Sequence, residues 1–256
     1  MDPALLAALP VDASAFLLLF GRVGAVLMLL PVFSEDAVPS RVRLMLAFGM
    51  TLAMWGLLSP QVLPHARDMD ALPGVLIVEV LIGLGLGMLV RLMFLAVAAA
   101  GSIISLQVGL TSAIMPDSMQ GGAATVLTKF LSVSASVMCM AMLVHHQWIL
   151  AIVKSYQTFP VGGLPPAGDF AQLAIATATR SLALAVGLAA PMIVYGLVFN
   201  VGLGLAARVA PAIQVFFIAQ PLNLVAGIAL FAVLGGAMLN AFAASFGAWM
   251  QTGLGG

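Results

Sequence analysis

Long apolar runs separated by short polar links make up most of the chain. Each run is close to or above the roughly 20 residues that an α-helix needs to cross a bilayer. The pattern therefore predicts an all-α integral membrane protein with about six hydrophobic segments, no tandem repeat and no separate soluble domain. The predicted spans are Ser14–Phe33, Leu44–Leu63, Pro73–Ala100, Val126–Val153, Leu173–Phe199 and Ala212–Leu239.

The interval after the third run differs from the other links. It is too polar to span a bilayer, yet between Gln107 and Gly122 it has a single charged residue, no Lys or Arg and no aromatic ring. Glycines rotate freely and methionines are soft, adaptable apolar groups, so this composition suits a mobile plug or lid beside a passage. The residues assigned to this plug are Gln107, Gly109, Met115, Pro116, Asp117, Met119, Gly121 and Gly122.

The chain is accordingly expected to form one membrane-embedded domain over residues 1–256. Its first helices lie in 14–100, a plug-like loop in 101–125 and the remaining helices in 126–239. Within the last run, Pro221 removes a backbone donor and is expected to break the helix. Such a break is tolerated at membrane depth where neighbouring protein surrounds the freed groups.

Composition supports the membrane assignment and narrows the function. Hydrophobic residues make up 63% of the chain and charged residues only 7%, against about 25% charged in soluble domains. The formal net charge is zero, so the chain lacks the excess of basic residues that is typical of nucleic-acid-binding proteins. The single cysteine, Cys139, excludes an intramolecular disulfide and a thiolate metal cluster.

Four residues of the third run, Glu79, Gly83, Gly87 and Arg91, are spaced four apart and form one stripe on a helix. The two glycines let another helix approach closely. A carboxylate at the centre of a membrane helix costs roughly 2.5–3.5 kcal/mol, so Glu79 is expected to face protein or water, with a proton relay as the alternative. Glu79 and Arg91 cannot pair, since twelve residues of helix span about 18 Å.

Basic residues inside other runs have few acidic residues to match them. Arg22 lies well inside its run and is expected to contact another subunit, whereas Lys129 and Arg180 are expected to reach partners or the membrane interface. The residues assigned to subunit packing are Arg22, Glu79, Gly83, Gly87, Arg91, Arg208, Pro211 and Pro221.

Catalytic and metal chemistry are not indicated. His145 and His146 are adjacent, so they diverge on a helix, and no Asp, Glu or Cys is placed to complete a metal shell. The sequence has no nucleophile elbow, phosphate loop or paired-carboxylate site. We therefore expect neither an enzyme nor a cofactor.

Six motifs follow one another along the chain: RVGAVLMLLPVFSEDAVPSRVRLMLA (22–47), VEVLIGLGLG (78–87), AGSIISLQVGL (100–110), HQWIL (146–150), FPVGG (159–163) and RVAPAIQVFFIAQPLNL (208–224). In this order they resemble the FliR family, the flagellar type III export-gate subunit also called flagellar biosynthetic protein R. The resemblance covers about Phe16 to Leu234 and departs from the family at Ser102, at Pro116-Asp117-Ser118 and at Ala212.

The resemblance implies a fold like a P-type and a Q-type export-gate subunit fused end to end. It implies one copy of the chain in a pore-forming hetero-oligomer with the P, Q, B and A subunits, in the bacterial inner membrane at the flagellar basal body. Unfolded flagellar subunits would pass through, and a loop corresponding to residues 107–122 would plug the pore. Much of each helix would be shielded by neighbouring subunits, so the six segments need not all be conventional spans.

Two alternatives remain open at this stage. The equivalent subunit of a virulence type III secretion system would share the mechanism and differ in cargo. A stand-alone secondary transporter would need a discontinuous helix with a polar midplane site, for which Gln220-Pro221-Asn223 is the candidate.

Overall fold

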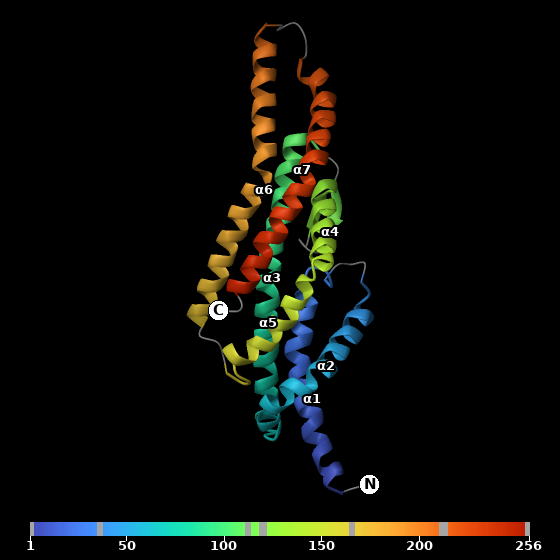
Figure 1. Cartoon of the computed structure of the whole chain (residues 1–256), viewed down its shortest axis with the longest axis vertical. Helices are drawn as coiled ribbons and strands as arrows, with labels where there is room; N and C mark the ends of the chain where they lie inside the picture. Colours follow the sequence, from blue (N-terminus) through green and yellow to red (C-terminus); the bar gives the residue numbers. More distant parts are fainter. Residues whose placement is uncertain are drawn as a thin grey trace. The chain divides into compact units, whose positions relative to one another are not determined.

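The computed structural model describes residues 3–34, 38–110, 114–117, 122–163, 167–209 and 215–253, with the backbone alone for residues 3–8, 114–117, 122–124 and 215–217. Over these ranges the protein is almost entirely helical, which confirms the predicted fold class (Figure 1). The elements are α1 (Pro3–Leu29), α2 (Ser40–Ala66), α3 (Leu72–Val108), β1 (Ile114–Asp117), β2 (Gly122–Thr125), α4 (Val126–Ala141), α5 (Val144–Thr158), α6 (Ala167–Val209) and α7 (Val215–Gly253).

Five of the described helices, α1, α2, α3, α6 and α7, are long and apolar enough to cross a membrane. The predicted fourth span, Val126–Val153, is instead two helices, α4 and α5, bent by 77°. The bend lies at Leu143, whose φ of 59° is in the left-handed region, where a helix cannot continue. The bent pair supplies a sixth span only if both helices are counted together.

The predicted loop at 101–125 is wrong for its first eight residues, because α3 continues to Val108. Ile104 and Val108 are buried, so the apolar face of α3 extends past Ala100 and stabilises the additional turns. Gly109, with a φ of +86°, then ends the helix as a left-handed C-terminal cap.

The predicted break at Pro221 is also wrong, because α7 runs from Val215 to Gly253 with Pro221 inside it. A proline removes the hydrogen bond that its own N–H would make to the carbonyl four residues earlier, and its ring crowds that carbonyl. Both effects fall on the first turn of α7, and the helix continues through Pro221 to Gly253.

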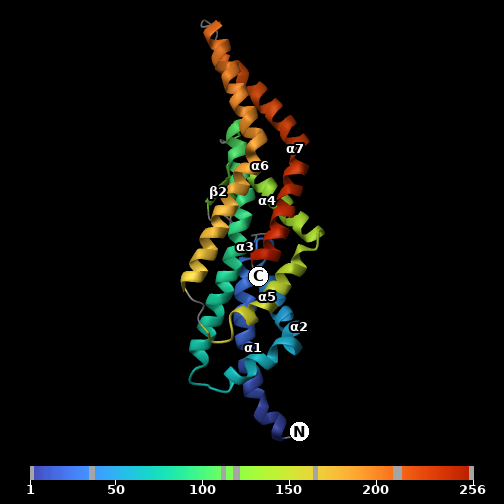
Figure 2. The same ribbon diagram turned by 60° about the vertical axis from the view of Figure 1, so that its left-hand side comes forward.

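The chain forms two compact units. The first comprises residues 1–92, 144–177 and 250–256, and the second comprises residues 93–143 and 178–249. In the first unit α1 and α2 lie side by side (Figures 1 and 2), where Phe16 packs against Phe48 and Trp55. The second unit holds a cluster of the buried rings Phe94, Phe242 and Phe246.

The second unit also holds the β-hairpin between α3 and α4. Its strands are antiparallel, and the register pairs Ile114 with Thr125 and Asp117 with Gly122. Both strands contact α4. The hairpin therefore carries the central part of the segment assigned to a plug.

Candidate functional site

The 107–122 segment begins on α3 and continues into the hairpin. Gln107 is in the last turn of α3, and the carbonyl of Ser105 accepts from the N–H of Gly109 (3.0 Å) and of Leu110 (2.9 Å). Met115, Pro116, Asp117 and Gly122 lie in the paired strands, opposite Ala124, Ala123, Gly122 and Asp117 respectively. Met119 and Gly121 lie outside the described residues.

A chain of hydroxyl groups fastens the other end of the hairpin to α3. Thr125 Oγ1 lies 2.5 Å from Ser105 Oγ and 2.7 Å from Thr128 Oγ1, which in turn lies 3.3 Å from Ser102 Oγ. Ser105 and Thr128 are fully buried. Ser105 therefore contacts Leu110, before the hairpin, through its carbonyl and Thr125, at the end of the hairpin, through its hydroxyl.

Close helix packing makes this hydroxyl chain possible. A Cβ added at Gly101 would lie 2.6 Å from the Cα of Thr128, so only glycine lets α3 and α4 approach this closely. Thr125 also caps α4, accepting from the N–H of Thr128 at 3.3 Å. Sequence reasoning missed this function of Thr125, although a threonine directly before an apolar run is an N-cap signal.

A polar cavity of about 240 Å³ lies beside the C-terminal end of α3, within the second unit. Asn223 Nδ2 donates to the main-chain oxygen of Gln107 at 3.0 Å. The hydroxyl of Tyr195 is 2.8 Å from Asn223 Oδ1 and 3.0 Å from its main-chain oxygen. The lining residues are Leu106, Gln107, Gly109, Phe199, Asn200, Leu203, Gln220 and Asn223.

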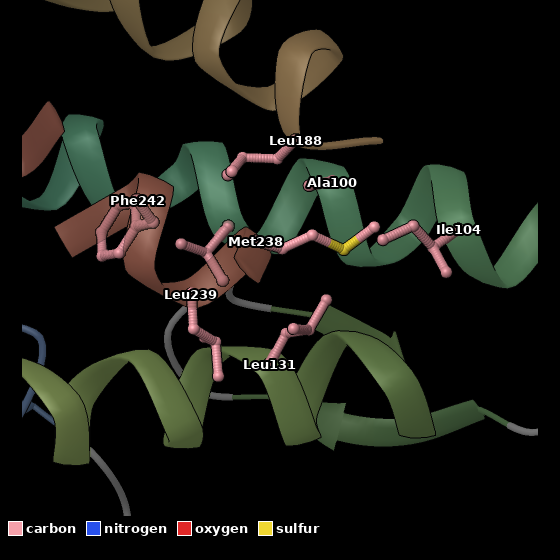
Figure 3. Close-up of a pocket in the computed structure, with 8 residues that line it drawn as sticks. Ala100, Ile104, Leu131, Leu188, Met238, Leu239 and Phe242 are labelled. Carbon is pink, nitrogen blue, oxygen red and sulfur yellow. The ribbon is translucent and has the colours of Figure 1, made fainter. Parts of the chain in front are cut away.

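A second pocket in the same unit is apolar and much smaller (Figure 3). Its volume is about 10 Å³, close to the minimum that admits one water molecule. Figure 3 shows Ile104, Leu131, Leu188 and Met238 converging on it from four helices. This pocket is a packing gap in the core and is too small for an organic ligand.

The first unit contains a fully buried ion pair. Arg22 Nε donates to Glu79 Oε2 at 2.7 Å, and its Nη2 donates to Oε1 at 2.9 Å, so the pair is bidentate. Both side chains have an exposed fraction of 0%. Arg22 therefore pairs within the chain, and the expectation that it contacts another subunit is wrong.

Further contacts surround this pair. Arg22 Nη1 donates to the carbonyl of Phe159 (3.0 Å) and to Ser155 Oγ (3.3 Å), and the guanidinium lies 3.9 Å from the centre of the Tyr156 ring. The N–H of Gly162 donates to Glu79 Oε1 at 3.3 Å. The result is a set of contacts that joins α1 and α3 to α5 and to the loop after it.

Glu79 does face protein, as the cost of exposing a carboxylate to lipid requires. Its two oxygens accept three hydrogen bonds from Arg22 and Gly162, so the geometry favours a structural contact over a proton relay. Sequence reasoning considered Glu79 only with Arg91 on the same helix. It could not supply the alignment of α1 against α3.

The glycine stripe brings α3 against α1 just beyond this pair. A Cβ at Gly83 would lie 2.5 Å from the carbonyl oxygen of Arg22, and one at Gly87 would lie 2.7 Å from Leu29 Cβ. The stripe thus packs within the chain. The other residues assigned to subunit packing do not join it: Arg91 is half-buried, Arg208 and Pro221 are exposed, and Pro211 lies outside the described residues.

No group of three His, Cys, Asp or Glu that could hold a metal ion occurs in the part of the chain that the structure describes. The rings of His145 and His146 lie 4.4 Å apart. Neither unit therefore has a candidate metal centre among its described residues.

Comparison with known proteins decides the family. Residues 13–249 match the family described as bacterial export proteins, family 1. The chain belongs to this export family. Flagellar biosynthetic protein FliR of Caulobacter vibrioides is 42% identical over 216 residues, which cover 84% of this chain and 86% of that protein.

Two further members of the export family are more distant. The FliR protein of Escherichia coli K12 is 35% identical, with 83% of this chain and 81% of that protein covered. The FliR protein of Bacillus subtilis is 28% identical, with 82% of each chain covered. These relatives confirm the resemblance to the FliR family, and the apolar helices make this member a multi-pass membrane protein.

Proposed function

We propose that this chain is a pore-forming subunit of the flagellar protein export gate and that its 107–122 segment plugs the pore. The observation that carries the proposal is the family match over nearly the whole chain, together with FliR relatives that cover four-fifths of it or more. In this proposal one copy, built like a fused P-type and Q-type subunit, joins the P, Q, B and A subunits in the inner membrane at the flagellar basal body. Unfolded flagellar subunits are the cargo.

Exposed apolar faces support assembly with other subunits. Over the 18-residue apolar stretch of each helix, only 28% of α6 and 17% of α7 is buried in the isolated chain. Large side chains such as Leu197 and Val201 on α6, and Leu222 and Val225 on α7, are more than half exposed. Faces of this kind require lipid or partner helices to cover them.

The hairpin has features that suit a plug. A lone two-stranded hairpin is at best marginally stable, so it can rearrange at low cost once its anchoring contacts break. Its described residues contain one charge, Asp117, and no aromatic side chain that would grip a passing polypeptide. The hydroxyl contact between Ser105 and Thr125 anchors the last residue of the hairpin to α3. Movement of the hairpin about this anchor would open the passage.

Genetic complementation tests the flagellar assignment. We expect this chain to restore swimming, and release of flagellar subunits into the medium, to a strain that lacks its own FliR. Restoration of virulence-type secretion without flagellar export would favour the related secretion system. A chain that restores neither, and that purifies intact without P and Q subunits, would be a stand-alone transporter.

Ion conductance tests the plug. Deleting Leu110–Gln120 should raise ion leakage through the reconstituted gate complex. Unchanged conductance in that deletion would show that the segment does not seal the pore, even where the chain complements export.

A further inference from the structure

We propose that the polar cavity at the end of α3 binds the main chain of an extended polypeptide in transit. The inference rests on the proposed export function and adds to it a contact site for the cargo, here called the amide cavity. Its polar side chains are Gln107, Asn200, Gln220 and Asn223, and its apolar ones are Leu106, Phe199 and Leu203.

The chemistry of the lining points to peptide groups. All four polar side chains are carboxamides, each of which offers two N–H donors and an acceptor oxygen. A peptide unit offers one donor and one acceptor. No lining residue is ionisable, so the cavity has no charge with which to select a phosphate, a metal ion or a charged side chain. Contacts to the main chain are independent of cargo sequence, which an export passage requires.

Two of the carboxamides remain available to a ligand. Asn223 is held by Tyr195 and by the carbonyl of Gln107, so it forms a fixed part of the wall. Asn200 uses only its Nδ2, which donates to the carbonyl of Gly196 at 2.8 Å, and the side chain of Gln220 makes no hydrogen bond to another described residue. Both side chains are exposed.

The size of the cavity fits a short stretch of main chain. Pockets for small organic ligands hold roughly 300–1,000 Å³, and this one holds about 240 Å³. Gly109 contributes a wall without a side chain, and Gln220 Nε2 lies 3.4 Å from the point where a Cβ at Gly109 would be. A larger residue at position 109 would narrow the cavity.

The cavity shares two residues with the proposed plug segment. Gln107 and Gly109 line the cavity and are also the first residues assigned to the plug. A polypeptide held by Asn200 and Gln220 therefore contacts the backbone at which the proposed plug segment begins. In this proposal the arrival of cargo is coupled to the plug through these two shared residues.

Site-specific photocrosslinking in the assembled export complex tests the proposal. A photoreactive phenylalanine derivative replaces Gln220 or Asn200, and a flagellar subunit fused to a domain that cannot unfold is stalled in transit. We expect crosslinks to the stalled cargo at both positions, with cargo segments of differing charge. Leu222, an exposed residue on the same helix, is the matched control and should give lipid or gate-subunit crosslinks only.

Shape-preserving variants provide a second measurement. Gln220→Met and Asn200→Leu remove the carboxamides with little change in side-chain volume. Gln220→Met should lower the crosslinking yield from position 200, and Asn200→Leu that from position 220, each on the order of fivefold, which is the effect of one lost hydrogen bond. Crosslinks to a gate subunit at 220 and 200, with or without cargo, would overturn the proposal and identify a subunit contact instead. Absence of cargo crosslinks in a complex that exports normally would overturn the amide cavity alone, whereas loss of export by the unmodified chain would overturn the proposed function as well.

Discussion

Removing one member of the Arg22–Glu79 pair should destabilise the first unit severely. Glu79→Gln keeps the size of the side chain but leaves the buried guanidinium without its counter-charge. Breaking a buried ion pair in this way costs roughly 3–5 kcal/mol. The upper part of this range applies because both charges have no exposed surface and the lost contact is bidentate.

The magnitude translates into a measurable change in melting temperature. For chains of 150–250 residues, 1 kcal/mol shifts the melting temperature by roughly 2–4 °C. A loss of about 4–5 kcal/mol in Glu79→Gln should therefore lower the melting temperature by roughly 8–20 °C. The assay is thermal unfolding of the detergent-purified export complex, followed by intrinsic fluorescence, with the amount of chain in membranes as a second readout. Arg22→Met should cause a loss of similar size.

Two further variants separate the ion pair from general packing. Arg22→Lys keeps the charge but lacks the planar fork that reaches Glu79 and the carbonyl of Phe159 at once, so its loss should be intermediate. The double variant Arg22→Met/Glu79→Leu has no unpaired charge and should recover much of the stability lost in either single variant. Single variants that melt within about 2 °C of the parent, or a double variant that is the least stable of all, would refute the reasoning.

Three other outcomes follow from the packing. Gly83→Val should separate α1 from α3, because the added Cβ would meet the carbonyl of Arg22, and the complex should therefore melt at a lower temperature. The control Gly74→Ala adds its Cβ to open space and should leave the melting temperature unchanged. Thr125→Val removes the hydroxyl that contacts Ser105 and should destabilise the hairpin by roughly 0.6–1.7 kcal/mol. The hairpin amides should then exchange hydrogen faster, and the complex should leak more ions. Unchanged exchange and leakage would show that the hydroxyl chain does not anchor the hairpin. Cys139, fully buried on α4, should resist maleimide in native membranes and react only after unfolding; labelling of the folded complex would contradict its burial.

The location of most helices could be predicted from the sequence, because a long apolar run in a chain with so few charges has only one common structural solution. Helix ends were harder to predict. The run around Leu143 contains neither glycine nor proline, so nothing local marks the 77° bend between α4 and α5. Conversely, Pro221 is a strong local signal for a break, which the surrounding helical turns of α7 override.

The candidate sites show the same limit more sharply. The composition of residues 107–122 singled out the interval in which the structure has a hairpin, although the strands themselves were not predicted. The sealing of a pore by this segment stays a prediction. The partners of Arg22 were out of reach, because Glu79, Ser155 and Phe159 are 57, 133 and 137 positions away and no local pattern records which helix faces meet. The hydroxyl chain around Ser105 likewise depends on the alignment of α3 with α4.

The buried ion pair also constrains how the chain enters the membrane. Arg22 and Glu79 are synthesised early, yet Phe159 and Gly162, which complete their hydrogen bonds, follow much later. Each charge alone costs roughly 2.5–3.5 kcal/mol at the centre of a membrane helix. Release of α1 and α3 from the insertion machinery as a pair avoids this cost, because Glu79 neutralises Arg22 once α3 has been made. The contacts of Phe159 and Gly162 with the pair form only after the loop that follows α5 has been translated.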